Sequence, residues 1–134
     1  YPVSSLVKKY RPDGYPEENA IVPHGMAVIL NAPAVFRFTA SACPERHLQA
    51  AAVLGASIEG ASLSDAGKIL ADRLIEMMRE MEMPNGLGDL GYGSEHLPAL
   101  VQGTLPQHRV TKLAPRAAAE EDLTGLFEDA MSYW

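Results

Sequence analysis

The chain has 134 residues, 47% of them hydrophobic and 21% charged, with a formal net charge of −6 at pH 7. The length and composition predict one globular domain over residues 1–134. The negative net charge and the scattered lysines and arginines, which form no stripe, exclude DNA and RNA as principal partners. The longest apolar stretch, Ala27 to Phe36, contains Asn31 and Pro33 and falls short of the roughly 20 residues that cross a bilayer, so we expect no membrane span.

The first predicted element, Met26 to Phe38, is apolar almost all round, so its periodicity allows either a buried helix or a buried strand. Its length favours a helix, kinked at Pro33. A shorter helix is predicted from Pro44, in the first-turn position that proline tolerates, to Gly55. We interpret Cys43, the only cysteine, as a small residue at the start of that helix, because nothing in the sequence around it would activate the thiol.

The clearest helix is predicted from Leu63 to Glu82, with Ser62 as its N-cap and Asp65 as the capping-box partner. The predicted buried face, defined by steps of three and four residues, comprises Ala66, Ile69, Leu70, Leu74, Met77, Met78 and Met81. The residues predicted to face water are Lys68, Asp72, Glu76, Arg79 and Glu80. The sequence Met83-Pro84-Asn85-Gly86 ends the helix, because proline cannot continue its hydrogen bonds.

The four glycines between Gly86 and Gly93 lack the spacing of a dinucleotide-binding fingerprint, so we interpret them as a flexible loop between helices. A further helix is predicted from Ser94 to near Gly103, and an irregular, extended connection from Leu105 to Pro115. The last helix has negative charge in its first turn, where the helix dipole favours it. Its predicted buried stripe comprises Leu123, Leu126, Phe127, Ala130, Met131 and Trp134. Because no alternating strand pattern is convincing, the predicted fold class is all-α, a bundle of helices packed on one another.

His24 is the main candidate for chemistry, because it lies where a loop leads into the apolar helix. The positive end of the helix dipole favours a neutral imidazole, whose lone pair can bind a divalent metal. A lone histidine is more commonly a capping or core residue, and the residues alone leave both interpretations open. The other three histidines have no second ligand three or four residues away, so we expect each to be exposed or to cap a helix. They are His47, His96 and His108.

The stretch YPVSSLVKKYRPDGYPEENAIVPHGMAVILNAPAVF resembles the metal-binding region of the iron-containing alcohol dehydrogenases, in which a Pro-His-Gly sequence opens a helix. The similarity is greatest to the hydroxyacid-oxoacid transhydrogenase subgroup and is carried by PERHLQAAAVLGA, SDAGKILADRL, LPALVQGTLPQHRVTKLAPR and EEDLTGLFEDAM. The resemblance implies the C-terminal helical domain of this dehydroquinate synthase-like family. It also implies that His24 is one of four metal ligands and that Tyr1, where many members have a second histidine, lines the active site.

The resemblance further implies hydride transfer between a hydroxyacid or alcohol and an oxoacid, with iron or zinc and NAD(P) in the complete enzyme. We expect this chain, which begins without an initiator methionine, to lack the N-terminal nucleotide-binding domain and three ligands, and to be inactive alone. We expect the complete enzyme to be a homo-oligomer in the cytoplasm, or in the mitochondrion of a eukaryote. The alternative is a stand-alone, non-catalytic helical interaction domain that retains only the fold.

Substrates that are acids need cationic partners, and an arginine that binds both carboxylate oxygens is the usual solution. The candidates are Arg109, Lys112 and Arg116, in the irregular sequence HRVTKLAPR. Surface cations on a connection more commonly contribute to solubility or contact another domain, so the sequence does not choose among the three.

Overall fold

The computed structural model describes all 134 residues and contains helices and turns without any strand, which confirms the all-α class. The longer helices are α2 (His24–Thr39), α3 (Pro44–Val53), α4 (Ala66–Glu80), α5 (Leu97–Thr104) and α7 (Glu120–Asp129). The short α-helices are α1 (Pro2–Ser5) and α6 (His108–Thr111). Four 3-10 turns occupy Ala40–Ala42, Leu63–Asp65, Gly88–Leu90 and Ser94–His96.

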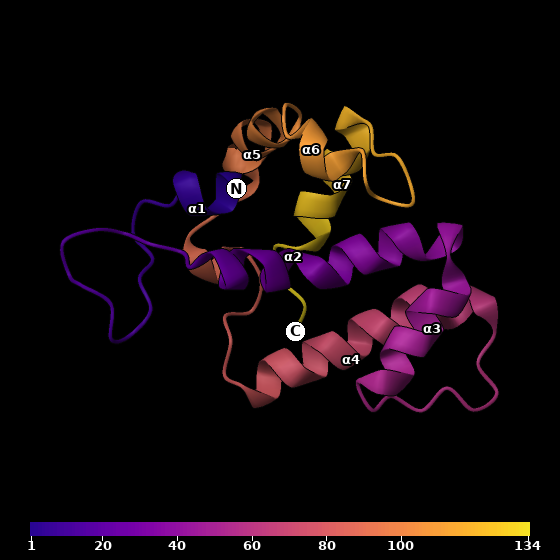
Figure 1. Cartoon of the computed structure of the whole chain (residues 1–134). Coiled ribbons are helices and arrows are strands. Elements are labelled where there is room, and N and C mark those ends of the chain that lie inside the picture. Colours follow the sequence, from indigo (N-terminus) through magenta and orange to yellow (C-terminus); the bar gives the residue numbers. More distant parts are fainter.

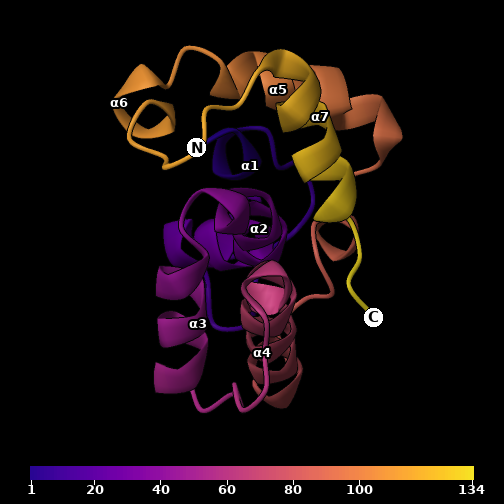
Figure 2. The same ribbon diagram turned by 90° about the vertical axis from the view of Figure 1, so that its right-hand side faces the viewer.

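Helix α2 lies in the middle of the molecule, between two groups of helices. Figure 1 shows α3 and α4 on one side of it and α1, α5, α6 and α7 on the other. The view along α2 in Figure 2 gives the same arrangement, and α2 packs most extensively on α4 and also contacts α7 and α1. Segments from both ends of the chain, α1 and α7, therefore lie against α2.

The segment after His24 is a helix, as its length predicted, and Pro33 lies within it without ending it. The sequence argument from length against a membrane span was wrong, because His24–Ala42 is long and apolar enough to cross a bilayer by length and composition. The core helix of a globular domain meets the same two criteria. In the structure α2 packs between two groups of helices, and the absence of a membrane span stays a prediction.

Two hydrophobic cores hold the helices together. The larger core joins α2 to α1, α5 and α7, and Leu30 and Leu100 are fully buried in it. The smaller core lies between α3 and α4 around Ala51, Leu70 and Leu74. Burial of a leucine side chain contributes roughly 1.5–3 kcal/mol, so Leu30 and Leu100 are major contributors to the stability of the larger core.

The start of α4 follows the predicted capping pattern. The Asp65 carboxylate accepts hydrogen bonds from the Ser62 hydroxyl at 2.6 Å and from the Ser62 backbone N–H at 3.0 Å. These bonds hold the pKa of Asp65 below its ordinary value. They enclose the 3-10 turn Leu63–Asp65, so the α-helix itself begins at Ala66 rather than at the predicted Leu63.

Two residues predicted to be buried at helix ends are exposed. Met81 is 60% exposed because α4 ends at Glu80 and Glu82 takes a positive φ of 55°, which turns the chain away from the helix. Trp134 is 41% exposed because α7 ends at Asp129, well before it. A buried face extrapolated at helical spacing holds only while the backbone stays helical.

The glycine-rich connection between α4 and α5 is packed, which corrects its interpretation as a flexible loop. The backbone N–H of Leu87 donates to the carbonyl of Ala130 at 2.9 Å, and that of Gly88 donates to the carbonyl of Met131 at 2.9 Å. Gly86 has a φ of +75°, and a Cβ atom there would lie 2.5 Å from the Ala130 carbonyl oxygen. The glycines therefore allow the connection to lie directly against the end of α7.

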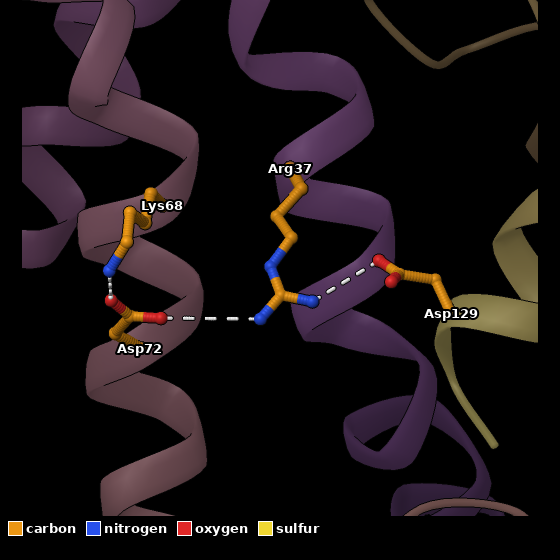
Figure 3. Close-up of polar contacts among 4 residues, drawn as sticks. All are labelled: Arg37, Lys68, Asp72 and Asp129. Carbon is orange, nitrogen blue, oxygen red and sulfur yellow. Dashed lines mark hydrogen bonds and ion pairs between the residues drawn. The ribbon is translucent and has the colours of Figure 1, made fainter. Parts of the chain in front are cut away.

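Arg37 links three helices on the surface (Figure 3). From α2, its Nη1 lies 3.2 Å from Oδ2 of Asp129 at the end of α7, and its Nη2 lies 4.0 Å from Oδ1 of Asp72 on α4. Asp72 also pairs with Lys68 one turn earlier on α4. Because exposed ion pairs contribute about 0–1 kcal/mol each, this network orients the helices more than it stabilises them.

Tyr133 connects the C-terminal segment to α2 and provides a pH-dependent test of the packing. Its hydroxyl donates to the Leu30 carbonyl at 2.8 Å, and burial raises the pKa of Tyr133 to about 12. The folded-state pKa lies above the unfolded value of about 10. The contribution of the neutral Tyr133 hydroxyl to the free energy of unfolding is therefore complete below pH 10 and is lost as the pH rises towards 12. We expect Tyr133→Phe to flatten the fall in the free energy of unfolding over this range, measured by urea denaturation.

The exposed Tyr15 supplies the control for that experiment. Tyr15→Phe should leave the fall in stability as it is in the unaltered chain. An equally steep fall in the Tyr133→Phe variant would show that the Tyr133 hydroxyl is not held neutral by folding.

Candidate functional site

His24 is the first residue of α2, and the loop before it fixes its position. Val22 is only 2% exposed and anchors this loop in the core. Pro23 is the N-cap, and its carbonyl accepts the first helical hydrogen bond, from the Ala27 N–H at 3.0 Å. The His24 side chain is exposed and forms no hydrogen bond within the chain, so a ring nitrogen is free to bind a ligand.

Tyr1 lies beside His24, with the two ring centroids 5.4 Å apart and the ring planes inclined by 33°. Packing of α1 fixes this arrangement. Pro2 packs on Gly103 of α5, where a Cβ atom would lie 2.9 Å from the proline ring, and the Tyr92 hydroxyl donates to the Val3 carbonyl at 2.7 Å. The sequence analysis did not predict α1, although a proline in the first helical position is a recognised start signal.

Arg109 approaches the same two rings from α6. This turn of helix corrects the extended connection predicted from Leu105 to Pro115. The Arg109 Cζ atom lies 4.8 Å from the Tyr1 ring centroid, within the roughly 6 Å over which a cation is attracted to an aromatic face. The guanidinium forms no hydrogen bond or ion pair within the chain. The structure therefore brings together three of the predicted site residues, in the order Arg109, Tyr1, His24.

An open pocket of about 490 Å³ begins at Tyr1 and His24 and follows the surface of α2. Most of its lining residues are hydrophobic, and they include Val28, Val35, Phe38, Val110 and Leu126. Sequence reasoning did not identify this lining. The sequence feature that could have predicted it is that α2 is apolar all round its circumference. Val28 is 55% exposed, so the rest of the chain leaves one apolar face of α2 partly open.

The other two candidate cations lie elsewhere. Arg116 lines the pocket at the end distant from His24, where its Nη1 donates to the Phe38 carbonyl at 3.1 Å and its Cζ lies 3.8 Å from the Phe38 ring centroid. Lys112 is the exposed C-cap residue of α6 and forms no ion pair. Of the three, only Arg109 lies beside Tyr1.

His47 corrects the expectation that the remaining histidines are exposed or capping, because it is only 5% exposed. Its Nε2 lies 3.0 Å from the Thr39 hydroxyl, and its Nδ1 lies 2.9 Å from the Cys43 carbonyl oxygen. Cys43 is the N-cap of α3, in agreement with its predicted place at the start of a helix. These bonds satisfy both ring nitrogens within the chain, so His47 is a structural residue.

The other two histidines follow the prediction. His96 has a capping role, since its Nδ1 accepts a hydrogen bond from the Gly93 N–H at 3.0 Å. His108 is exposed at the first position of α6. Neither ring lines the pocket that begins at His24.

The chemistry of the available donors limits how this chain can hold a metal. No group of three or more histidine, cysteine, aspartate or glutamate side chains gathers in a metal-binding arrangement anywhere in the chain. Protein sites for first-row metals use three or four such ligands. A free, exposed imidazole at a helix start therefore fits a single ligand of a set completed by other residues.

Comparison with known proteins gives consistent results. Residues 19–131 match the C-terminal part of the Fe-containing alcohol dehydrogenase family. The mitochondrial hydroxyacid-oxoacid transhydrogenases of Xenopus tropicalis and Rattus norvegicus are each 52% identical to this chain over all 134 residues, and that of Homo sapiens is 49% identical. The chain spans 29% of the length of each of these relatives.

A solved structure shows the same fold. The crystal structure of a 1,3-propanediol oxidoreductase matches this chain with a TM-score of 0.73 and 27% sequence identity. The match covers 81% of this chain and 28% of the other. Both kinds of comparison therefore place the 134 residues as a minor part of a longer polypeptide in these proteins.

Proposed function

Because this chain belongs to the Fe-containing alcohol dehydrogenase family, we propose that it is the C-terminal helical part of an oxidoreductase that transfers hydride between hydroxyacids and oxoacids. The observation that carries the proposal is the free imidazole of His24 at the mouth of a pocket, in a chain 52% identical throughout to transhydrogenases. The 134 residues form the domain that contributes this ligand. Residues outside them complete the metal site and supply the nucleotide-binding domain.

Each residue of the site has a separate task in this proposal. His24 would hold an iron or zinc ion through one ring nitrogen, and Tyr1, whose ring packs beside the imidazole, would limit its rotation. In the complete enzyme a bound metal would supply Lewis-acid polarisation of the substrate oxygen, and bound NAD(P) would supply the hydride-transfer chemistry. The apolar pocket lining, including Val28 and Val110, excludes water from the substrate.

The names of the relatives support a proposal for the cellular context. The transhydrogenases compared above are named as mitochondrial, and we place the enzyme in the mitochondrion if its source is a eukaryote and in the cytoplasm otherwise. Its partners are small hydroxyacids and oxoacids and further copies of the same enzyme. Such an enzyme acts twice with one cofactor, first oxidising a hydroxyacid such as 4-hydroxybutyrate and then reducing an oxoacid such as 2-oxoglutarate.

A chimeric enzyme tests the proposal directly. The 134 residues would replace their aligned counterpart in the Xenopus tropicalis transhydrogenase, whose remaining sequence supplies the other ligands and the nucleotide-binding domain. We expect the purified chimera to contain stoichiometric metal and to couple 4-hydroxybutyrate oxidation to 2-oxoglutarate reduction within about tenfold of the parent rate. The 134-residue chain assayed alone should be inactive.

A folded chimera without metal and without turnover would contradict the proposal. Folding would be checked by circular dichroism and by the temperature of unfolding, so that a misfolded chimera is not mistaken for an inactive one. The same result would favour a stand-alone helical domain that retains the fold without the chemistry.

A further inference from the structure

We infer that Arg109 binds the carboxylate of the substrate and thereby sets the preference of the enzyme for hydroxyacids over neutral alcohols. This inference rests on the proposed function, because it takes the reacting end of the substrate to lie at a metal held by His24. It assigns a specificity role to one of the three cations in HRVTKLAPR, which the sequence alone could not distinguish.

The hydrogen-bonding state of Arg109 is the first reason. A guanidinium presents five N–H donors in a planar fork that matches the two oxygens of a carboxylate. Arg37 and Arg73 already use theirs on carboxylates of the chain, and Arg116 uses one on the Phe38 carbonyl. The donors of Arg109 form no hydrogen bond or ion pair within the chain, so all of them are available to a ligand.

The way in which Arg109 is held is the second reason. Its Cζ lies 4.8 Å from the centroid of the Tyr1 ring, so the guanidinium lies over the face of an aromatic ring. Attraction between a cation and an aromatic face holds the side chain in place without using any of its N–H groups in a hydrogen bond or ion pair. The side chain is thus positioned before a carboxylate arrives, which reduces the entropy that binding would cost.

The distance from His24 is the third reason. The Tyr1 ring centroid lies 5.4 Å from that of His24, so the guanidinium can be no farther from the imidazole than the sum of the two centroid distances. In an extended four-carbon hydroxyacid, the hydroxyl oxygen and the carboxylate carbon are about 5 Å apart, from ordinary bond lengths. A substrate whose hydroxyl lies beside His24 can therefore extend its carboxylate towards Arg109.

The length of α2 excludes Arg116 as the group that binds the carboxylate. Arg116 contacts Phe38, fourteen residues after His24 along α2, which corresponds to about 21 Å at roughly 1.5 Å per residue. A short hydroxyacid cannot reach both ends of such a pocket. Neither Lys112, at the C-cap of α6, nor Arg109 is among the residues that line the pocket. Arg109 differs from Lys112 by its contact with the Tyr1 ring, which does line the pocket beside His24.

The test compares an acid with a neutral alcohol of the same chain length in the chimeric enzyme. We expect Arg109→Ala to lower kcat/KM for 4-hydroxybutyrate about 10- to 100-fold, mainly through a higher KM, because a charge-assisted pair is lost from ground and transition states alike. The kcat/KM for 1-butanol should stay within about threefold, since that substrate has no carboxylate. Arg109→Lys should retain part of the activity on the acid.

Arg46→Ala is the matched control, because Arg46 is exposed on α3, away from the pocket. It should leave both substrates unaffected. An equal loss on 4-hydroxybutyrate and 1-butanol in Arg109→Ala would show that Arg109 only supports Tyr1 and His24, and no loss on either would show that it binds nothing. Both results would overturn the assignment while the unaltered chimera remained active, whereas an inactive unaltered chimera would overturn the proposed function and this inference together.

Discussion

Replacing His24 with alanine is expected to lower the metal affinity of the chimeric enzyme by more than about 100-fold, because loss of a direct ligand costs more than the 10- to 100-fold seen for outer partners. Turnover of 4-hydroxybutyrate should fall by at least a similar factor, since Lewis-acid polarisation supplies several kcal/mol and each 1.4 kcal/mol is worth about tenfold. Metal content after dialysis and steady-state kinetics measure the two effects. Because the His24 side chain is exposed, the substitution should leave the free energy of unfolding of the metal-free protein nearly unchanged.

His108→Ala provides a matched control for this experiment. Both histidines are exposed and occupy the first position of a helix, and neither ring forms a hydrogen bond within the chain. The His108 variant should keep its metal and its turnover. Retained metal and unchanged turnover in the His24 variant would remove the residue on which the proposed function depends.

Replacing Gly86 with alanine is expected to lower the free energy of unfolding by about 2–5 kcal/mol. A residue other than glycine at its φ of +75° costs about 1–2 kcal/mol. The added Cβ would also lie 2.5 Å from the Ala130 carbonyl oxygen and 2.6 Å from that of Met131. Backbone must then move apart, which adds about 1–3 kcal/mol and weakens the hydrogen bonds between this connection and the end of α7.

Gly60→Ala separates the cost of the positive φ from the cost of the close approach to the end of α7. Gly60 has a similar φ of +72°, but a Cβ atom there would meet nothing within 4 Å, so only the backbone term should appear. Chemical denaturation of the 134-residue chain measures both variants on the same scale. Equal destabilisation by the two substitutions would show that the close approach at Gly86 is relieved without cost.

The sequence predicted helices well wherever a local signal was strong. The capping residues Ser62 and Asp65 and the proline at position 44 located the beginnings of α4 and α3 to within a few residues. The errors lie at the ends of helices and where burial depends on tertiary contacts. Met81 and Trp134 continue a helical stripe in sequence but lie beyond the last helical turn, and His47 is buried by partners that no spacing rule identifies.

The candidate site could be predicted only in part, because some of its residues are brought together by tertiary contacts. His24 has a local signal, the loop that leads into an apolar helix, and the family resemblance gave it a role. The choice of Arg109 over Lys112 and Arg116 required the positions of α1 and α6 relative to α2. Those positions depend on contacts such as that of Pro2 with Gly103, between segments about a hundred residues apart in the chain, and no periodicity in the sequence encodes them.

The central place of α2 links ligand binding at its first residue to the folding of the whole chain. Its first turn carries His24, its last turn carries Arg37, and both groups of helices pack on the turns between. Unwinding the first turn would expose the buried Ala27 and loosen the helix that both groups pack on, so a cation bound there adds its binding free energy to the folding equilibrium of every helix. Enzyme loaded with metal should consequently resist heat and proteases better than enzyme stripped of it, even at cleavage sites remote from the pocket.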